Sequence, residues 1–432
     1  MTTTVQDIPF TELAERFGTP LFVYDARVLA AQYERLRAGL DPAVELFYSL
    51  KANPNAAVCA YLHGLGAGAE VSSLAELLTA QRAGVPADDI VFPGPGKQPG
   101  ELTACLDTGV HAVVCESIGE LAALDELARI RAVRAPVAIR VNPSFSVRAS
   151  TLAMGGKPRQ FGIDEDQLSR DLLARFPNVD VLGIHVYLGT RLLDASVVVE
   201  NTVRILDLAG SLADRLGLDL RLVDVGGGLG VPYFDGEQDL DLGALVPGLN
   251  GAFAAFRATR PGVRLIMELG RYLTAPAGTY LMRVRYTKTS QGRRFAITDG
   301  GTHHHMAAVG IGSFVKRDFP MFLASRTASR TASRAGTATD PWTIAGPLCT
   351  PNDTLGRNVA LPALRPGDLI GVRQSGAYGP TASPGLFLSH GYPAEVLVHE
   401  GRAYLVRDRD EPADLLAKQH LPELPALVLE GT

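Results

Sequence analysis

Eight short β-branched segments recur between residues 44 and 270, and helical patterns separate them. Apolar strands that alternate with helices are typical of a parallel sheet covered by helices on its outer face. Eight such units predict a (β/α)8 barrel over residues 40–280. A doubly wound open sheet would show the same alternation, but the number of units favours the barrel. The segments are VELFYSL (44–50), GAEVSS (68–73), DIVFPG (89–94), HAVVCES (111–117), PVAIRVN (136–142), VLGIHVYL (181–188), LRLVDVGG (220–227) and VRLIMEL (263–269).

The pattern changes after about residue 280, where strand-like segments follow one another with few helical stretches between them. This change predicts a β-rich domain over residues 281–432, completed by residues 1–39. Within it, the polar tandem repeat ASRTASRTASRAGTATD (324–340) is too poor in apolar residues to form a core, so we expect a surface loop.

Composition excludes several classes of protein. The 41 basic and 46 acidic residues include no dense basic tract, which argues against nucleic-acid or membrane-surface binding. Four cysteines without CxxC spacing disfavour a structural zinc site. His303–His305 invite a metal interpretation, but adjacent side chains diverge and no carboxylate cluster accompanies them, so no metal is expected. No apolar run reaches the roughly 18 residues of a membrane span, and the N-terminus is unlike a signal peptide. A cytoplasmic location is therefore expected.

Several polar or glycine residues fall at the ends of the predicted strands, which converge on one mouth of a barrel. Taken singly, each has a structural explanation: Lys51 as a solvated loop residue, His185 as a satisfied core histidine, Glu268 as an ion-pair partner. Taken together, they suit one chemistry. The set is Lys51, Arg140, His185, Asp224, Gly226, Gly227, Gly228 and Glu268.

That chemistry is the binding of an aldehyde cofactor. A lysine at a barrel mouth can form a Schiff base, and a glycine-rich strand end offers backbone N–H groups to a phosphate. A carboxylate facing a pyridine nitrogen keeps that nitrogen protonated, and an imidazole can lie flat on the ring. The sequence therefore predicts a pyridoxal 5′-phosphate site.

Motifs along nearly the whole chain resemble those of the alanine racemase-fold pyridoxal-phosphate decarboxylases, the group of the diaminopimelate and ornithine decarboxylases. In order, the motifs are FYSLKANPN, GAEVSSLAE, CESIGEL, AIRVNP, RQFGID, GIHVYLGT, DVGGGLG, ELGRY, GPLCTPND and SGAYG. One departure is RQFGID, because the family usually has a lysine before its FG pair.

The resemblance implies a role for each matching residue. Lys51 would bind the cofactor covalently, His185 would stack on its ring and Glu268 would face the ring nitrogen. Cys349 of GPLCTPND would protonate Cα, a step that suits a thiol, although a free cysteine is more often a small buried hydrophobe. Asp353 would contact the substrate. The remaining expected cofactor contacts are Arg140, Gly226, Gly227, Gly228, Gly270, Arg271 and Tyr378.

The resemblance also implies a homodimer whose active sites are shared, with Cys349 and Asp353 entering the site built around Lys51 of the other subunit. Within the family, diaminopimelate enzymes carry a glutamate, and ornithine enzymes an aspartate, at the position of Thr350. An arginine or aspartate usually follows the DGG-like turn, but residues 301–314 read GTHHHMAAVGIGSF. A buried amine without a carboxylate partner costs several kcal/mol by rough estimate, which disfavours free ornithine, lysine or diaminopimelate.

The motifs MGGKPRQFGID, HVYLGTRLL and GPLCTPND look closer to another branch. That branch includes a decarboxylase of glutamyl groups held on an acyl carrier protein in butirosin-type assembly, and the exosortase-associated pyridoxal decarboxylases. We therefore expect a decarboxylase of a carrier-tethered or conjugated amino acid in specialised biosynthesis, with an acyl carrier protein as partner. His303–His305 and Arg191 are further candidates for substrate contacts.

Three alternatives stay open. The substrate could be a free amino acid such as diaminopimelate, ornithine or lysine. A racemase of this fold would need a tyrosine as second base, where GPLCTPND supplies a thiol. A non-catalytic homologue would be expected to lack cofactor contacts that this sequence retains.

Overall fold

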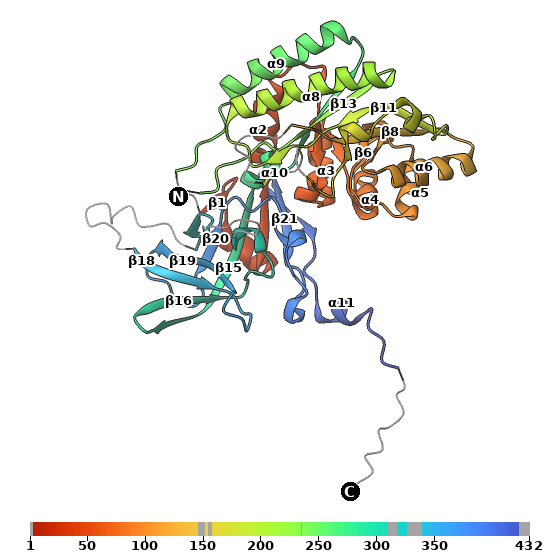
Figure 1. Ribbon diagram of the computed structural model, residues 1–432. Helices are drawn as coiled ribbons and strands as arrows, with labels where there is room; N and C mark the ends of the chain where they lie inside the picture. Colours follow the sequence, from red (N-terminus) through yellow and green to blue (C-terminus); the bar gives the residue numbers. More distant parts are fainter. Residues whose placement is uncertain are drawn as a thin grey trace.

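The computed structural model describes residues 3–145, 152–153, 158–234, 236–309, 318–325 and 339–422. A barrel of strands and helices lies beside a smaller domain made mainly of strands (Figure 1). Residues 326–338, most of the tandem repeat, lie outside the described residues. Within the described part of the chain, no helix combines the length and the apolar character needed to cross a membrane.

Eight parallel strands form a closed ring in the order β8-β11-β13-β14-β4-β5-β6-β7, and β7 pairs with β8 to close it. The predicted (β/α)8 barrel is therefore confirmed, and the open sheet is excluded. The strands are β4 (Val44–Ser49), β5 (Gly68–Glu70), β6 (Ile90–Phe92), β7 (Ala112–Cys115), β8 (Ala135–Asn142), β11 (Val179–His185), β13 (Leu222–Gly227) and β14 (Arg264–Leu269).

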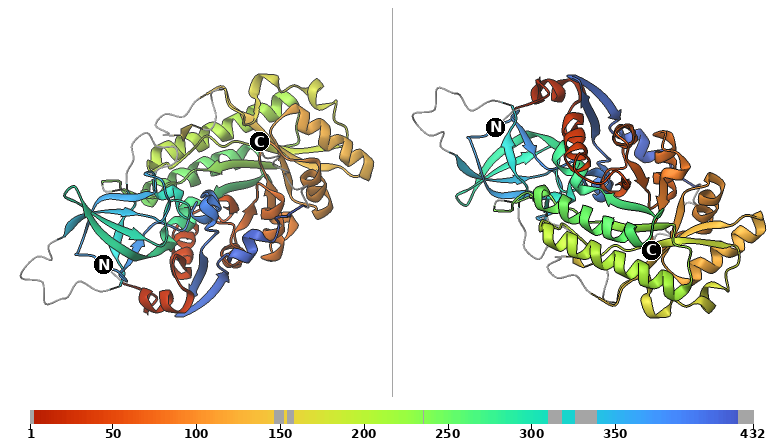
Figure 2. Two further views of the ribbon diagram at one scale, coloured as in Figure 1. Left: turned by 90° about the horizontal axis from the view of Figure 1, so that it is seen from below. Right: turned by 90° about the horizontal axis from the view of Figure 1, so that it is seen from above.

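A helix follows each barrel strand. The two longest, α8 and α9, lie side by side along one flank of the barrel (Figure 2). The helices are α3 (Ala56–Gly64), α4 (Leu74–Arg82), α5 (Pro99–Thr108), α6 (Ile118–Arg131), α7 (Arg170–Leu173), α8 (Ala195–Leu216), α9 (Leu242–Thr259) and α10 (Arg271–Thr274). The preceding α2 (Ala26–Arg37) contacts α10 and α3.

Alternation along the strands gives the barrel two apolar layers. In β14, Ile266 belongs to a small cluster with Phe47 and Leu222, whereas Leu265 and Met267 belong to the larger core under the helices. Successive side chains of a strand point to opposite faces, so the small cluster fills the barrel interior. Side chains at the carboxyl ends of the strands are left to form the mouth.

The second domain contains a sheet with the order β19-β18-β16-β15-β3-β21-β22, and β20 pairs with both β15 and β17. Its strand β3 comes from the first forty residues and pairs with β15 and β21, whereas α2, which follows β3, packs against helices of the barrel. The strands are β3 (Leu21–Asp25), β15 (Gly278–Ser290), β16 (Arg293–Thr298), β17 (Met321–Leu323), β18 (Asp340–Ala345), β19 (Thr354–Leu361), β20 (Leu369–Val372), β21 (Ala394–His399) and β22 (Arg402–Arg407).

Candidate active site

A pocket of about 360 Å³ opens at the carboxyl ends of the barrel strands. The structure brings together five residues that the sequence placed in the cofactor site, namely Lys51, Arg140, His185, Glu268 and Tyr378. Lys51, Arg140, His185 and Glu268 meet because parallel strands end at the same rim, and Tyr378 reaches the pocket from the loop after β20 of the second domain. The other lining residues are Glu70, Ser72, Pro93, Gly94, Pro95, Phe161, Tyr187 and Thr190.

Lys51 stands at the turn after β4 and is held by a carboxylate. Its Nζ donates to Glu70 Oε1 at 3.0 Å, and the Ser72 hydroxyl donates to the same oxygen. Burial lowers the pKa of Lys51, but Glu70 and Glu268 outweigh it and raise this pKa above its ordinary value. The amine is therefore held as an ammonium, and Glu70 lies where it can accept a proton from it.

Glu268, at the end of β14, is an ionised carboxylate in the barrel interior. Burial alone would raise its pKa, but His185, Lys51 and Arg140 lower the pKa to about 2. His185 Nε2 lies 3.2 Å from Glu268 Oε1. Neighbouring Asp224 has a strongly raised pKa because it is buried beside Glu268. One carboxylate of the pair thus carries the charge.

His185, Asp224 and Glu268 also place one potential ligand atom each within 4.8 Å of one another. Such a set of atoms has the spacing of a divalent-cation site. The ammonium of Lys51 and the guanidinium of Arg140 already act on Glu268 and oppose a further charge of +2. An ionised carboxylate that faces a singly protonated ring nitrogen agrees better with these surroundings.

Arg140 on β8 is held by Glu116, which follows β7. Its Nη1 donates to Glu116 Oε1 at 2.9 Å, and its guanidinium lies 4.7 Å from the ring centroid of Phe161. Glu116 also accepts from the backbone N–H groups of Gly94 and Gly162, so it ties three loops of the mouth together. Sequence reasoning missed the roles of Glu70 and Glu116, although both stand at strand ends, the feature that singled out Glu268.

The glycines after β13 allow close packing of backbone at the rim. A Cβ on Gly227 would lie 1.7 Å from the Glu268 carbonyl oxygen, and Gly226 has a φ of 66°. Gly270 is confined in the same way, because its Cβ would lie 2.9 Å from that of Ala52. These positions need glycine for packing. The phosphate contacts expected of Gly226, Gly227, Gly228 and Gly270 stay predictions.

Arg271 lies outside the pocket lining and packs against Tyr378, which is part of that lining. The guanidinium of Arg271 lies 4.5 Å from the ring centroid of Tyr378, and its Nη1 donates to Tyr233 Oη at 2.8 Å. The backbone N–H of Tyr378 donates to the Ala52 carbonyl, which fixes this loop against the turn that carries Lys51. Arg271 Nε is buried and lacks a hydrogen-bond partner within the described residues. Tyr233 was not singled out from the sequence.

Within one chain, Cys349 and Asp353 are not among the residues that line the Lys51 pocket. Cys349 is the exposed member of the four cysteines, whereas burial raises the pKa of Cys59 and Cys105 to about 12. Asp353 is buried and accepts from the Thr302 N–H and hydroxyl and from the Leu348 N–H. Its carboxylate therefore closes the loop that carries Cys349, and the expected substrate contact of Asp353 stays a prediction.

His303–His305 are buried and do not line the Lys51 pocket. His304 Nε2 lies 2.9 Å from the Gly391 carbonyl, and His305 Nε2 lies 2.9 Å from Ser375 Oγ. Burial lowers the pKa of His303 to about 4 and that of His305 to about 3. The histidine run is thus a neutral, packed element.

Arg191 likewise lies outside the lining of the Lys51 pocket. It pairs with Glu237 at 3.2 Å, and its guanidinium lies 5.4 Å from the Tyr233 ring centroid and 5.2 Å from that of Phe234.

The pocket residues fit a pyridoxal cofactor. The mouth holds one lysine, an ionised carboxylate deep in the barrel, and walls that include the rings of Phe161 and Tyr187. His185 Nδ1 is buried without a hydrogen-bond partner among the described residues, which agrees with an imidazole that packs against a ligand face. These features match a reactive amine, a partner for a ring nitrogen and apolar surfaces for a ring.

Comparisons with known proteins agree with this geometry. The model of the pyridoxal-dependent decarboxylase pyridoxal binding domain matches residues 27–275. The L-glutamyl-[BtrI acyl-carrier protein] decarboxylase of Niallia circulans is 40% identical over 413 residues, which cover 95% of each chain. The diaminopimelate decarboxylase of Pseudomonas fluorescens is 35% identical over 425 residues, or 96% of each chain.

Solved structures show the same fold. The crystal structure of diaminopimelate decarboxylase from M. jannaschi superposes with a TM-score of 0.85 at 29% identity, covering 96% of this chain and 95% of that chain. The resemblance inferred from the motifs is confirmed, together with the cofactor that it implied. The chain therefore belongs to the pyridoxal-dependent decarboxylases, and it is a lyase whose cofactor is pyridoxal phosphate.

Proposed function

We propose that this enzyme removes the α-carboxylate of an amino acid whose distal group is held as a thioester on a carrier protein, in a specialised biosynthetic pathway of the cytoplasm. The relative from Niallia circulans is named for such a glutamyl substrate and is 40% identical over 95% of this chain. The proposal extends that similarity to the substrate class.

The observation that carries the proposal is that the carboxylates of the candidate site already have partners within the chain. Glu70 is bonded to Lys51, Glu268 to His185, and Asp353 to donors of its own chain. Glu116 is likewise bonded to Arg140. Although Glu70 Oε2 accepts no hydrogen bond within the described residues, each of these carboxylates already faces a cation or N–H donors of its own chain, and Thr350 supplies no further carboxylate. A distal amine would therefore be desolvated without a partner, whereas an uncharged thioester would not.

The residues of the pocket divide the chemical work. Pyridoxal phosphate, when bound, supplies an electron-withdrawing ring that accepts the electron pair left when CO2 departs. Lys51 is the amine that would hold the cofactor covalently, and Glu268 would hold a proton at the ring nitrogen. His185 would keep the ring plane fixed. Arg140 and Tyr378 would form part of the wall of the site. The position of these side chains around one pocket supports the proposed roles.

Cys349 is proposed as the acid that delivers a proton to Cα after CO2 has left. Because Cys349 is exposed and outside the Lys51 pocket of its own chain, we place it in the active site of a second subunit. The enzyme would then be a homodimer with two shared sites.

CO2 release by the pyridoxal-loaded protein tests the substrate class. One set of assays would offer free diaminopimelate, ornithine, lysine and glutamate, and the other would offer glutamate as a thioester of BtrI or of pantetheine. Release from the thioesters alone supports the proposal. Fast release from a free diamino acid would overturn it, and exchange of the α-hydrogen for deuterium without CO2 release would indicate a racemase.

Mixing two inactive variants tests the shared site. Lys51→Ala and Cys349→Ala each disable a different half of every site, so random exchange of subunits restores one intact site in the mixed dimers. About a quarter of wild-type activity should return. If none returns although native mass spectrometry shows mixed dimers, Cys349 does not act across the interface.

A further inference from the structure

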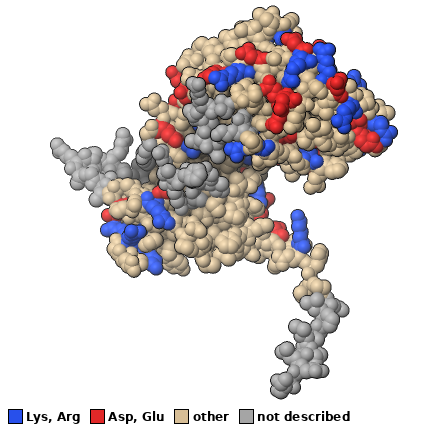
Figure 3. Space-filling model, viewed as in Figure 1, with Lys and Arg blue, Asp and Glu red and all other residues tan. Residues whose placement is uncertain are grey.

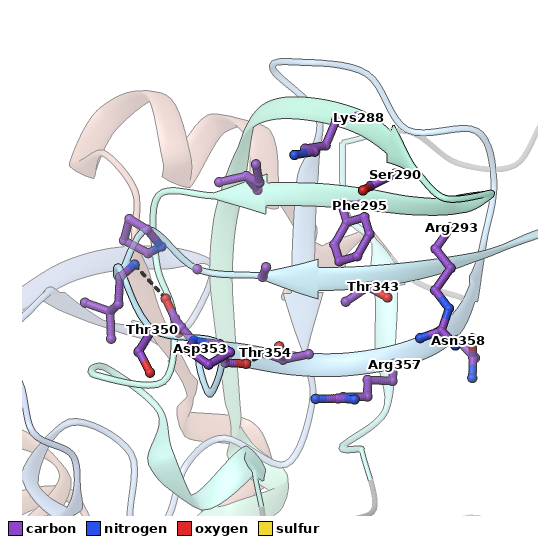
Figure 4. Close-up of a pocket in the computed structure, with 16 residues that line it drawn as sticks. Lys288, Ser290, Arg293, Phe295, Thr343, Thr350, Asp353, Thr354, Arg357 and Asn358 are labelled. Atoms are coloured by element: carbon purple, nitrogen blue, oxygen red, sulfur yellow. Dashed lines mark hydrogen bonds between the residues drawn. The ribbon is translucent and has the colours of Figure 1, made fainter.

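A second cavity, a groove of about 780 Å³, runs over the outer face of the β-rich domain (Figure 4). Its floor and sides come from β15, β16, β18 and β19, and one end is formed by the loop Gly346–Asp353 that carries Cys349. The lining residues are Lys288, Ser290, Arg293, Phe295, Ile297, Thr343, Ala345, Gly346, Pro347, Leu348, Thr350, Pro351, Asp353, Thr354, Arg357 and Asn358.

The alternation of β16 makes the groove amphipathic along its length. Arg293, Phe295 and Ile297 share the groove face, and Phe295 lies opposite Lys288 on β15 and opposite Thr343 on β18. The intervening Ala296 is buried in the core. Arg293 and Ile297 are four residues apart, which is about 14 Å along a strand. The groove therefore combines an apolar strip, formed by Phe295 and Ile297, with polar and basic side chains beside it.

Three cations border this groove, and their side chains have no partner in the part of the chain that the structure describes. Lys288, Arg293 and Arg357 are exposed, and within the described residues none of their side chains has an ion pair or a hydrogen bond. By contrast, neighbouring Arg294 pairs with Asp340. Among the described lining residues Asp353 is the one carboxylate, and it is already bonded to Thr302 and Leu348; Asp318, outside the lining, accepts from the backbone N–H of Arg357. The groove is therefore suited to an anion.

The charges and the thiol loop lie at different places along the groove. Arg293, Arg357 and Asn358 gather at one end, and Thr350 and Asp353 lie at the other (Figure 4). Lys and Arg side chains are also grouped on the visible surface of this end of the β-rich domain (Figure 3). An elongated ligand with an anion at one end would place its other end beside the loop of Cys349.

We propose that this groove binds the arm that tethers the substrate, a linear amide chain with a phosphate at one end and the thioester at the other. This inference rests on the proposed function, because only a tethered amino acid brings such an arm. The phosphate binds at Arg293 and Arg357, which can form bidentate hydrogen bonds with it, while the apolar part of the chain packs on Phe295 and Ile297. The thioester end then reaches the loop of Cys349 and the adjoining active site.

The test compares two small thioesters of glutamate that differ by one phosphate, glutamyl-phosphopantetheine and glutamyl-pantetheine. For the wild-type holoenzyme, kcat/KM should be about tenfold higher with the phosphorylated arm, equivalent to about 1.4 kcal/mol. In the double variant Arg293→Gln/Arg357→Gln this ratio should fall towards one. Arg402→Gln is the matched control, because Arg402 is exposed on β22 outside the groove.

A further assay with glutamyl-BtrI separates the two sources of such an arm. A lower KM for glutamyl-BtrI than for glutamyl-phosphopantetheine would show that the arm is presented by a carrier protein, and equal values would indicate a free phosphorylated thioester. Either result keeps the groove as the phosphate site.

Three outcomes would overturn the inference. The ratio of kcat/KM between the two thioesters could be one in the wild type, it could stay unchanged in the double variant, or Arg402→Gln could lower it as much as the double variant does. Light scattering supplies a further check, because a double variant that becomes monomeric would show that the groove is a subunit interface. If neither thioester releases CO2, the proposed function itself has failed, which is a different result from an unchanged ratio.

Discussion

Substitution of Asp353 tests whether its carboxylate holds the loop of Cys349 in place. Its carboxylate accepts three hydrogen bonds, from Thr302 N at 2.7 Å, Thr302 Oγ1 at 2.9 Å and Leu348 N at 2.8 Å. Cβ atoms on Gly301 and Gly346 would lie within 2.4 Å and 2.3 Å of its oxygens, so the carboxylate fills a space that two glycines leave open. The loop is therefore closed by one side chain.

The structure sets the expected cost of removing that side chain. Hydrogen bonds to a charged group contribute about 1.5–3 kcal/mol each, and a buried N–H left without a partner costs about 1–3 kcal/mol. Asp353→Ala leaves two backbone donors unsatisfied, so we expect a loss of about 4 kcal/mol in the free energy of unfolding. Asp353→Asn keeps the shape and one acceptor oxygen, and should lose about 2 kcal/mol.

Urea unfolding measures these losses directly. Trp342, the only tryptophan, is buried in β18 beside this loop, so its fluorescence reports on the β-rich domain. Amide exchange at Thr302 and Leu348 should also accelerate, because both N–H groups lose their acceptor. Asn352→Ala is the matched control, since Asn352 is exposed and adjacent. A loss below about 0.5 kcal/mol for Asp353→Ala, or an equal loss for the control, would refute this account.

Three further predictions concern single side chains. Glu268→Gln should lower kcat/KM by about a hundredfold or more and change the absorbance of the bound cofactor, because it removes the ionised carboxylate proposed to face the ring nitrogen. Unchanged absorbance would contradict that role. Iodoacetamide should alkylate Cys349 first and inactivate the enzyme, since burial protects the other thiols, and mass spectrometry after tryptic digestion would locate the adduct. The His305 pKa of about 3 lies below the ordinary 6.5, so its contribution to stability is complete above pH 6.5 and falls as the pH drops towards 3. At pH 5 the lost contribution to the free energy of unfolding is about 2 kcal/mol. Between pH 8 and pH 5 the free energy of unfolding should therefore fall by about 2 kcal/mol less in His305→Phe than in the wild type, and equal falls in both proteins would contradict this prediction.

Much of the barrel could be predicted because its pattern is local. Each strand carries its own run of β-branched residues, and each is followed by helical periodicity. Lys51, Arg140, His185 and Glu268 could be assigned to one pocket because parallel strands end at a common rim. That rule needs only the positions of strand ends along the chain.

The sequence could not reveal which carboxylate partners which cation. Glu70 with Lys51, and Glu116 with Arg140, are pairs formed by neighbouring strands and loops, at 3.0 Å and 2.9 Å. Nor could it show that the histidine run packs as neutral core, because burial and not composition lowers those pKa values. Such contacts depend on distances between residues that are far apart in the chain.

The amino-acid sequence by itself thus determined the alternating fold, the cofactor chemistry and the order of the motifs, since each is a property of local pattern and residue type. Tertiary structure alone decided the ionisation of Glu268 beside Asp224, the closure of the Cys349 loop by Asp353 and the amphipathic groove between four strands. The physical reason is that desolvation, charge pairing and cavity shape arise only when distant segments are brought within a few ångströms.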